Sequence, residues 1–438
     1  MTTAREAVRT GRARWGIAGV LGVGMFVNYI DRVNLSIAAP EIMRDFEISA
    51  SQMGLLSSAF LWTYAMLQLP IGSIVDRIGV RWVNRVAAAL WAVASFASAA
   101  AGGLGLLLAS RLVLGVGEAP TIPAGWKAIG QWFPRQERGT ATAIFDGCAK
   151  ASNVLGIPVM AFLVTTFSWH AAFLFTGALS VVYLLVWWFL YLTPKQALAR
   201  GRLTEAEYAY IRQNGAEDED ATNSGSSLRG LGHLLRRRKT WGLALGYASY
   251  TYAYYVLLTW LPGYLEKQFG VKLLAGGVYT MIPWLVAVAA QFLIAGVVMD
   301  RLIALSGDET KVRRIVLVVS MLVSLSVAGA AYADSVAVAL VFLSIGAAGL
   351  AVSVPAGASI VALIAPEGFT GTLGGIVNFV ANLLGIAAPI VTGAVVDVTG
   401  SFAGAFLVTG VVLVAGILCY TLVLGRIEPM RAPDAERG

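Results

Sequence analysis

Six charged residues interrupt apolar runs of about 20 residues, the length of helix that crosses a bilayer. They are Asp31, Arg32, Arg111, Glu118, Asp146 and Lys150. An unpaired charge at the centre of a bilayer costs about 3 kcal/mol or more. Because the set contains as many acids as bases, its members can neutralise one another or line a polar cavity. We therefore expect them to form a buried polar site.

The basic and acidic members of this set suit different tasks. A guanidinium can hold a carboxylate through two parallel hydrogen bonds, so Arg32 and Arg111 are candidates for binding an anion. A buried carboxylate can take up a proton, because burial favours its neutral form. Asp31 and Glu118 are therefore candidates for proton coupling. The competing interpretation is that these groups only form ion pairs between helices.

Helical spacing limits which of these side chains can meet. Arg111 and Glu118 are seven residues apart and share a helix face. Gly115 lies between them on that face and leaves room for a ligand or another helix. Asp31 and Arg32 are adjacent, so they point about 100° apart and cannot occupy one spot.

Lys150 has two interpretations. Its ammonium could bind a carboxylate as a second cation of the site, or it could pair with Asp146, four residues earlier on the same helix face. The spacing favours neither interpretation.

Tyrosine and asparagine side chains supply the uncharged part of the expected site. Tyr254 and Tyr255 stand within an apolar run, where they either reach a cavity or act as interfacial anchors. Asn378 and Asn382 lie one helical turn apart and either bind substrate or form hydrogen bonds between helices. Tyr29 lies on the same helical stripe as the first buried arginine.

Twelve apolar runs must position these side chains. Hydrophobic residues make up 58% of the 438 residues and charged residues 13%, whereas an ordinary soluble domain has roughly 25% charged residues. We therefore expect an all-α membrane protein with twelve transmembrane helices. The predicted spans are residues 15–37, 53–75, 83–101, 104–126, 140–166, 170–193, 241–265, 275–299, 313–333, 335–364, 371–397 and 401–424.

Residues 194–239 form the one long polar interruption, with an acidic, a Ser/Gly-rich and a basic tract in succession. This composition is typical of a linker. We expect an N-terminal six-helix bundle over residues 1–193, a cytoplasmic linker over 194–239, a C-terminal six-helix bundle over 240–425 and a cytoplasmic tail over 426–438.

The distribution of Lys and Arg predicts the orientation. With the amino terminus in the cytoplasm, 26 of the 32 Lys and Arg residues lie on the cytoplasmic side, and only Arg44, Lys267 and Lys272 lie outside. Cytoplasmic loops of membrane proteins carry such an excess, so both termini should be cytoplasmic. The net charge of +7 is then mostly a topology signal, and we expect no nucleic-acid partner.

A short motif occurs twice. GSIVDRIGVRW follows the second span from Gly72 to Trp82, and GVVMDRL follows the eighth from Gly296 to Leu302, at a constant offset of 224 residues. Two six-helix halves related in this way are typical of transporters whose substrate site lies between the halves near the midplane. The loop charges are expected to hold the halves together in the outward-open state, as conformational residues: Asp76, Arg77, Arg81, Asp300 and Arg301.

These motifs resemble those of the major facilitator superfamily, whose loop signature matches GSIVDRIGVRW. Three further stretches resemble its anion:cation symporter family, which includes bacterial galactonate, glucarate and hexuronate transporters, sialin and vesicular glutamate transporters. They are NYIDRVNLSIAAP (28–40), RLVLGVGEAPTIPA (111–124) and GGIVNFVANLLGIAAP (374–389). The resemblance covers the whole chain and implies a major facilitator fold of two six-helix bundles.

The resemblance also implies roles for single residues. Asp31 and Glu118 match carboxylates used for proton coupling, and Tyr64 and Asn378 match positions on the substrate side. Two departures stand out: Lys150 replaces an uncharged polar residue, and the stretch 355–359 is small throughout where relatives carry a tryptophan. The expected substrate-binding residues are Arg32, Arg111, Tyr29, Tyr64, Lys150, Tyr254, Tyr255, Asn378 and Asn382.

The expected function is proton-coupled import of an organic anion, a sugar acid such as a hexuronate or aldonate, by alternating access across the inner membrane. Aromatic or dicarboxylic anions, anion antiport and sodium coupling are the alternatives. The sequence has no paired histidines and no nucleotide-binding loop, so we expect no enzyme activity, metal or cofactor. The expected partners are the anion, protons and the lipid bilayer, and we expect a monomer.

Overall fold

The structure is a computed structural model that describes residues 11–218, 228–306, 309–366 and 369–430. At several of these positions, Asp300 among them, it describes the backbone but not the side chain. The first half contains α1 (Ala13–Asp45), α2 (Ala50–Ile78), α3 (Val80–Ala99), α4 (Leu104–Glu118), α5 (Thr121–Trp132), η1 (Arg135–Glu137), α6 (Arg138–Thr166) and α7 (Trp169–Leu190). Three short helices follow: α8 (Pro194–Ala199), α9 (Glu205–Gln213) and α10 (Leu228–Leu235). The second half contains α11 (Arg238–Phe269), α12 (Leu273–Ala290), η2 (Gln291–Val298), α13 (Met299–Ser306), α14 (Glu309–Ser324), η3 (Leu325–Tyr332), α15 (Val336–Ile364), α16 (Thr370–Thr399), α17 (Ala403–Leu418) and η4 (Cys419–Val423).

These helices make twelve consecutive segments of membrane-crossing length. Among the described residues, nine are apolar enough to be candidate spans, and the pair of helical pieces in α2, bent at residue 69, adds a tenth. The remaining two are α3, with 20 residues, and α11, with 32. At a rise of about 1.5 Å per residue, each is long enough to cross a bilayer core. The expected all-α membrane fold is confirmed.

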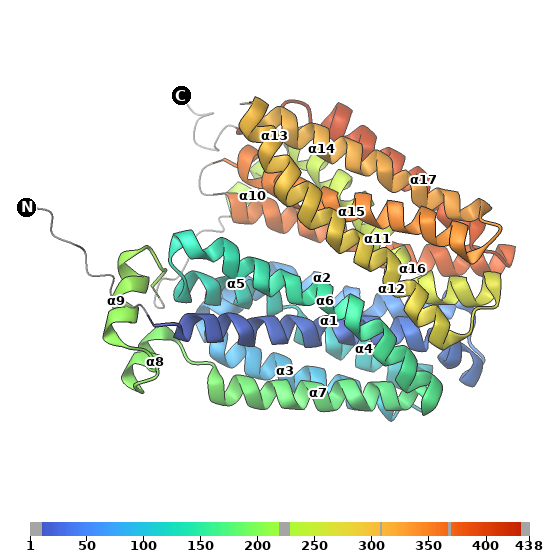
Figure 1. The fold of residues 1–438 in the computed structure, drawn as a ribbon, viewed down its shortest axis with the longest axis horizontal. Coiled ribbons are helices and arrows are strands. Elements are labelled where there is room, and N and C mark those ends of the chain that lie inside the picture. Colours follow the sequence, from blue (N-terminus) through green and yellow to red (C-terminus); the bar gives the residue numbers. More distant parts are fainter. Residues whose placement is uncertain (1–10, 219–227, 307–308, 367–368, 431–438) are drawn as a thin grey trace, which may run out of the picture.

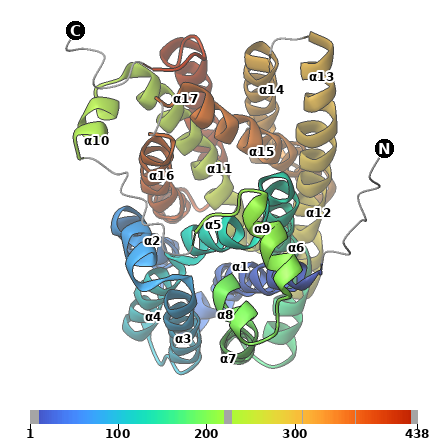
Figure 2. The same cartoon turned by 90° about the vertical axis from the view of Figure 1, so that its left-hand side faces the viewer.

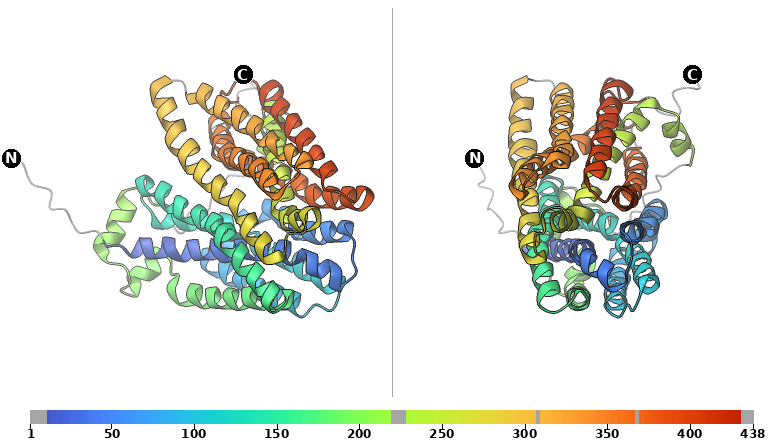
Figure 3. Two further views of the ribbon diagram at one scale, coloured as in Figure 1. Left: turned by 45° about the vertical axis from the view of Figure 1, so that its right-hand side comes forward. Right: turned by 90° about the vertical axis from the view of Figure 1, so that its right-hand side faces the viewer.

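The segments form two bundles that meet at one end and diverge at the other. Figures 1 and 3 show α1–α7 in one group and α11–α17 in the other, in contact on the right of Figure 1 and separated toward the left. Helix α2 packs against α16, α6 against α12 and α1 against α11. We call the end where α1 begins the linker face, because α8 and α9 lie there (Figure 2), and the opposite end the distal face.

The apolar core shows the same asymmetry. One buried cluster runs through the second bundle and continues into the distal ends of the first, where it includes Ile37, Met53 and Val164. A separate cluster fills the rest of the first bundle toward the linker face. The two bundles therefore share the larger buried cluster at the distal face.

The linker helix α9 is anchored to the first bundle by buried charges. Arg14, at the start of α1, pairs with Glu137 at 2.7 Å and with Glu207 of α9 at 2.9 Å. Glu207 also accepts hydrogen bonds from the backbone N–H groups of Ala13 and Arg14. A carboxylate at this position satisfies N–H groups that lack partners within the helix, so α9 caps α1.

Candidate functional site

A cavity of about 540 Å³ lies between the two bundles. Its lining comes from α1, α2, α5 and α6 of the first bundle and from α11, α12, η2, α15 and α16 of the second. The predicted substrate-binding residues on this lining are Tyr29, Arg32, Tyr64, Lys150, Tyr254, Tyr255, Asn378 and Asn382. Arg111 is the one predicted substrate residue that the structure places outside this cavity.

The first bundle contributes a buried ion pair to the cavity wall. Arg32 Nε of α1 donates to Glu118 Oε2 of α4 at 2.7 Å, and the Glu118 side chain is completely buried. Aromatic rings surround the Arg32 guanidinium, with ring centroids 4.7 Å away at Tyr29, 4.8 Å at Phe60 and 5.2 Å at Tyr64. These rings hold the guanidinium at the cavity, and its Nε is the donor that binds Glu118.

Asp31 and Arg111 lie behind the cavity. Ser95 of α3 donates its hydroxyl to Asp31 Oδ1 at 3.0 Å. Arg111 donates to the backbone carbonyl of Asp31 at 3.4 Å and to the hydroxyl of Ser98 at 3.5 Å. Its guanidinium also lies 5.1 Å from the ring of Phe173. The two charges are thus neighbours held by backbone and hydroxyl groups.

The face of α4 that carries Arg111 and Glu118 contacts two other helices. Arg111 and Glu118 share a face of the helix, but Glu118 pairs with Arg32 of another helix. The room at Gly115 is taken by α2, because a Cβ there would meet the Phe60 carbonyl oxygen and the Thr63 hydroxyl. The glycine therefore allows a close helix contact and leaves no space for a ligand.

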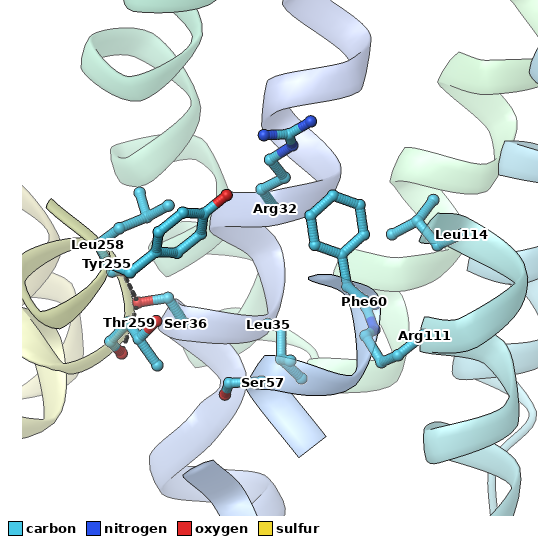
Figure 4. Close-up of a pocket in the computed structure, with 10 residues that line it drawn as sticks. All are labelled: Arg32, Leu35, Ser36, Ser57, Phe60, Arg111, Leu114, Tyr255, Leu258 and Thr259. Atoms are coloured by element: carbon cyan, nitrogen blue, oxygen red, sulfur yellow. Dashed lines mark hydrogen bonds between the residues drawn. The ribbon is translucent and has the colours of Figure 1, made fainter. Parts of the chain in front are cut away.

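A smaller pocket of about 30 Å³ continues from the cavity toward the distal face. Arg32 and Arg111 both line it, with Phe60 and Tyr255 on its walls (Figure 4). A pocket of this size can hold a water molecule. At its base, Ser36 donates its hydroxyl to α11 carbonyl oxygens, shown as dashed lines in Figure 4.

Lys150 lies on the cavity wall and forms no ion pair with any carboxylate of the described residues. Asp146, one turn earlier on α6, lies near enough to interact electrostatically and also lines the cavity. The i,i+4 pair that the spacing allows is therefore absent here. Asn153, one turn beyond Lys150, reaches the cavity as well and interacts with Tyr254 of the second bundle.

The second bundle supplies an aromatic and amide surface. The rings of Tyr247, Tyr250 and Tyr254 follow one another along α11 at centroid distances of 5.4 and 6.0 Å. Trp284 of α12 packs against Tyr254 at 5.4 Å. Asn382 donates to Asn378 at 3.4 Å on α16.

Asn153 and Trp284 belong to this wall although the sequence did not predict them as site residues. Asn153 could have been found from its position one helical turn after Lys150. Trp284 carries no such signal, because a tryptophan in an apolar span equally suits lipid contact. Its role on the wall depends on α12 packing beside α11.

Polar contacts close the distal face, and we call them the distal seal. Ser36 of α1 donates to the carbonyl oxygens of Leu258 at 2.6 Å and Thr259 at 3.0 Å in α11. Asp397 of α16 accepts the backbone N–H groups at the start of α2. Exposed Arg44 and half-buried Glu266 form an ion pair at 3.6 Å. These contacts join the bundles and leave the cavity closed toward the distal face.

The predicted conformational residues lie toward the linker face. Asp76 pairs at 2.6 Å with Lys127 of α5, within the first bundle. Arg81 donates to Gln196 of α8 at 3.0 Å. Arg77 and Arg301 are exposed, and the Asp300 side chain lies outside the described residues.

The sequence matches the model of the Major Facilitator Superfamily over residues 21–307. It is 38% identical to "Uncharacterized transporter YybO" of Bacillus subtilis, over 97% of both chains. Identity is 31% to "Probable galactarate/D-glucarate transporter GudP" of Bacillus subtilis, over 95% of this chain and 92% of that protein. Identity is 30% to "D-galactonate transporter" of Escherichia coli O6:H1, over 97% of this chain and 98% of that protein. All three are named as transporters, in agreement with the expectation that the chain is no enzyme.

The fold is similar to that of a bacterial homologue of the human lysosomal transporter Spinster, solved in an inward-facing and unoccupied conformation. The TM-score is 0.76 with 17% identity, over 95% of this chain and 98% of that one. This likeness establishes the fold of two six-helix bundles. With the sequence matches, it identifies the chain as a multi-pass membrane transporter of the major facilitator superfamily, a member of its anion:cation symporter family.

Proposed function

We propose that the protein imports a sugar-acid anion together with protons across the inner membrane, by alternating access between the two bundles. The observation that carries this proposal is the Arg32–Glu118 ion pair on the wall of the cavity. It places a cation suited to a carboxylate beside a buried acid suited to a proton. The names of the relatives that transport galactonate or galactarate and glucarate support a sugar acid.

The geometry suggests how proton and anion binding are linked. A proton on Glu118 removes its charge and weakens its hold on Arg32, whose guanidinium can then bind a substrate carboxylate through two parallel hydrogen bonds. Glu118 Oε1 has no hydrogen-bond partner among the described residues, so it can accept this proton. Binding of proton and anion should therefore favour each other.

Asp31 is the second proposed proton site. Its Oδ2 is buried without a hydrogen-bond partner in the described part of the chain, while Oδ1 accepts from Ser95. Arg111 contacts the backbone of Asp31 and lies outside the main cavity. We therefore assign Arg111 to positioning Asp31, and the substrate carboxylate to Arg32.

Alternating access requires that the distal seal opens as the linker face closes. In this proposal the linker face is cytoplasmic, both termini lie there, and the protein works as a monomer. Asp76, Arg77, Arg81, Asp300 and Arg301 would then stabilise the outward-open state, in which the linker-face ends of the bundles meet.

Uptake of radiolabelled galactonate into proteoliposomes tests the proposal. An acidic exterior should drive accumulation, and a protonophore should abolish it. Glu118→Gln should lose accumulation yet retain exchange of labelled for unlabelled anion, and Arg111→Ala should lose accumulation. Undiminished uptake with the gradient collapsed would exclude proton coupling, and dependence on sodium at constant pH would favour sodium coupling.

A further inference from the structure

The cavity has two cationic positions, and Glu118 neutralises only one of them. Among the described residues on its lining, the positive charges belong to Arg32 and Lys150 and the negative charge to Asp146. Arg32 is paired with Glu118, whereas Lys150 and Asp146 form no ion pair. The half-buried Lys150 ammonium has no close anionic partner among the described residues, so it is suited to an anionic group that enters the cavity.

The depths of the two cations can be compared because α1 packs closely along α6. Gly22 lies beside Cys148, and Ile30 lies beside Gly156. Arg32 lies ten residues beyond Gly22, and Lys150 lies two residues beyond Cys148. At about 1.5 Å per residue, the backbone of Arg32 is roughly 12 Å deeper than that of Lys150.

The wall between these depths carries hydrogen-bonding groups. Asn153 lies one turn deeper than Lys150, and Tyr254 interacts both with Asn153 and with Arg32. Tyr29 lies against the Arg32 guanidinium. An elongated ligand with an anionic group at each end and hydroxyl groups between them would match this arrangement.

We infer that the preferred substrate is a dicarboxylic sugar acid, with one carboxylate on Arg32 and the other on Lys150. This inference rests on the proposed function, and it names the substrate class. A sugar acid with a single carboxylate would bind Arg32 and leave Lys150 with only the electrostatic interaction with Asp146. Lys150 is thus a specificity-determining residue that distinguishes a diacid from a monoacid.

Galactarate and galactonate form a suitable pair of probes, because they differ only in the group at the second end of the chain. Uptake of each should be measured in proteoliposomes under the same pH gradient, with wild type, Lys150→Gln, Lys150→Arg and the exposed control Lys272→Gln. Wild type should have a KM for galactarate at least about tenfold lower than for galactonate. Lys150→Gln should raise the galactarate KM at least about tenfold and the galactonate KM less than about twofold.

The charge-preserving Lys150→Arg should retain the preference for galactarate, which separates a charge effect from a folding defect. Thermal unfolding of each purified variant checks the fold independently. Equal effects of Lys150→Gln on both anions, or a wild type that prefers galactonate, would overturn the inference while the proposed function stands. A wild type that transports neither anion would overturn the proposed function itself.

Discussion

Ser51 at the start of α2 donates its backbone N–H to the carboxylate of Asp397 near the end of α16, at 2.7 Å. The other carboxylate oxygen accepts the N–H of Ala50 at 2.9 Å. Asp397 therefore caps a helix of the opposite bundle, in addition to the capping box that Ser49 and Gln52 form within α2. A cap shared between bundles exists only while the distal face is closed.

Asp397→Ala should accordingly shift the protein toward the outward-open state. Loss of a carboxylate cap costs about 1 kcal/mol, which changes the equilibrium between the two states by roughly fivefold. Ser57 lines the small pocket, so a cysteine placed there by Ser57→Cys reports access from the distal side. A membrane-impermeant thiol reagent added on that side should label it correspondingly faster in the Asp397→Ala variant. Asp334→Ala, an exposed acid, serves as control, and unchanged labelling would show that Asp397 has no part in the seal.

Gly54→Val should block closure of the distal face. A Cβ at Gly54 would meet the backbone carbonyl oxygen of Pro389 in α16. Overpacking costs about 1–3 kcal/mol, and the strain is relieved when the bundles separate. Uptake should fall by about tenfold or more while substrate binding, measured by thermal shift, persists. Gly105→Val, where a Cβ would meet nothing within 4 Å, should transport normally.

Arg14→Ala should destabilise the first bundle. It leaves Glu207, which is 1% exposed, without its cation, and breaking a buried ion pair costs about 3 kcal/mol. The unfolding temperature in detergent should fall by several degrees, whereas the exposed Arg12→Ala should leave it unchanged. Adding Glu207→Ala to Arg14→Ala should cost less than the sum of the single changes; simple additivity would argue against the pairing.

Asn378→Ala should alter selectivity and leave proton coupling intact. The amide lines the cavity on α16 and bonds Asn382, away from the buried acids of the first bundle. Loss of one hydrogen bond to the substrate should raise KM about tenfold, with the ratio of protons to anions unchanged. The control is Gln213→Ala on the exposed surface of α9. A changed proton ratio would mean that the two bundles do not divide these tasks.

The sequence predicted the positions of the helices far better than the side-chain contacts between them. An apolar run is a local property, so spans such as 140–166 and 371–397 lie close to α6 and α16. The predicted span 104–126 lies within the segment Leu104–Trp132, which is interrupted at Ala119 and Pro120 between α4 and α5; the proline was the available signal.

Partners between helices depend on which spans become neighbours, and spacing along one helix does not reveal this. Arg111 and Glu118 share a face of α4, yet Glu118 bonds Arg32 of α1. Likewise, Asp146 and Lys150 have the spacing of a helical pair but form no ion pair. Both side chains line the cavity, where their neighbours include residues of other helices. The α6 sequence alone does not predict those neighbours.

The distal seal has one further consequence. Ser36 bonds carbonyl oxygens of α11, and Asp397 bonds amide hydrogens of α2. In both contacts, one partner is a peptide group that every non-proline residue possesses. These bonds therefore do not depend on the side-chain identity of Ala50, Leu258 and Thr259, and the mutational sensitivity of these two contacts falls on Ser36 and Asp397.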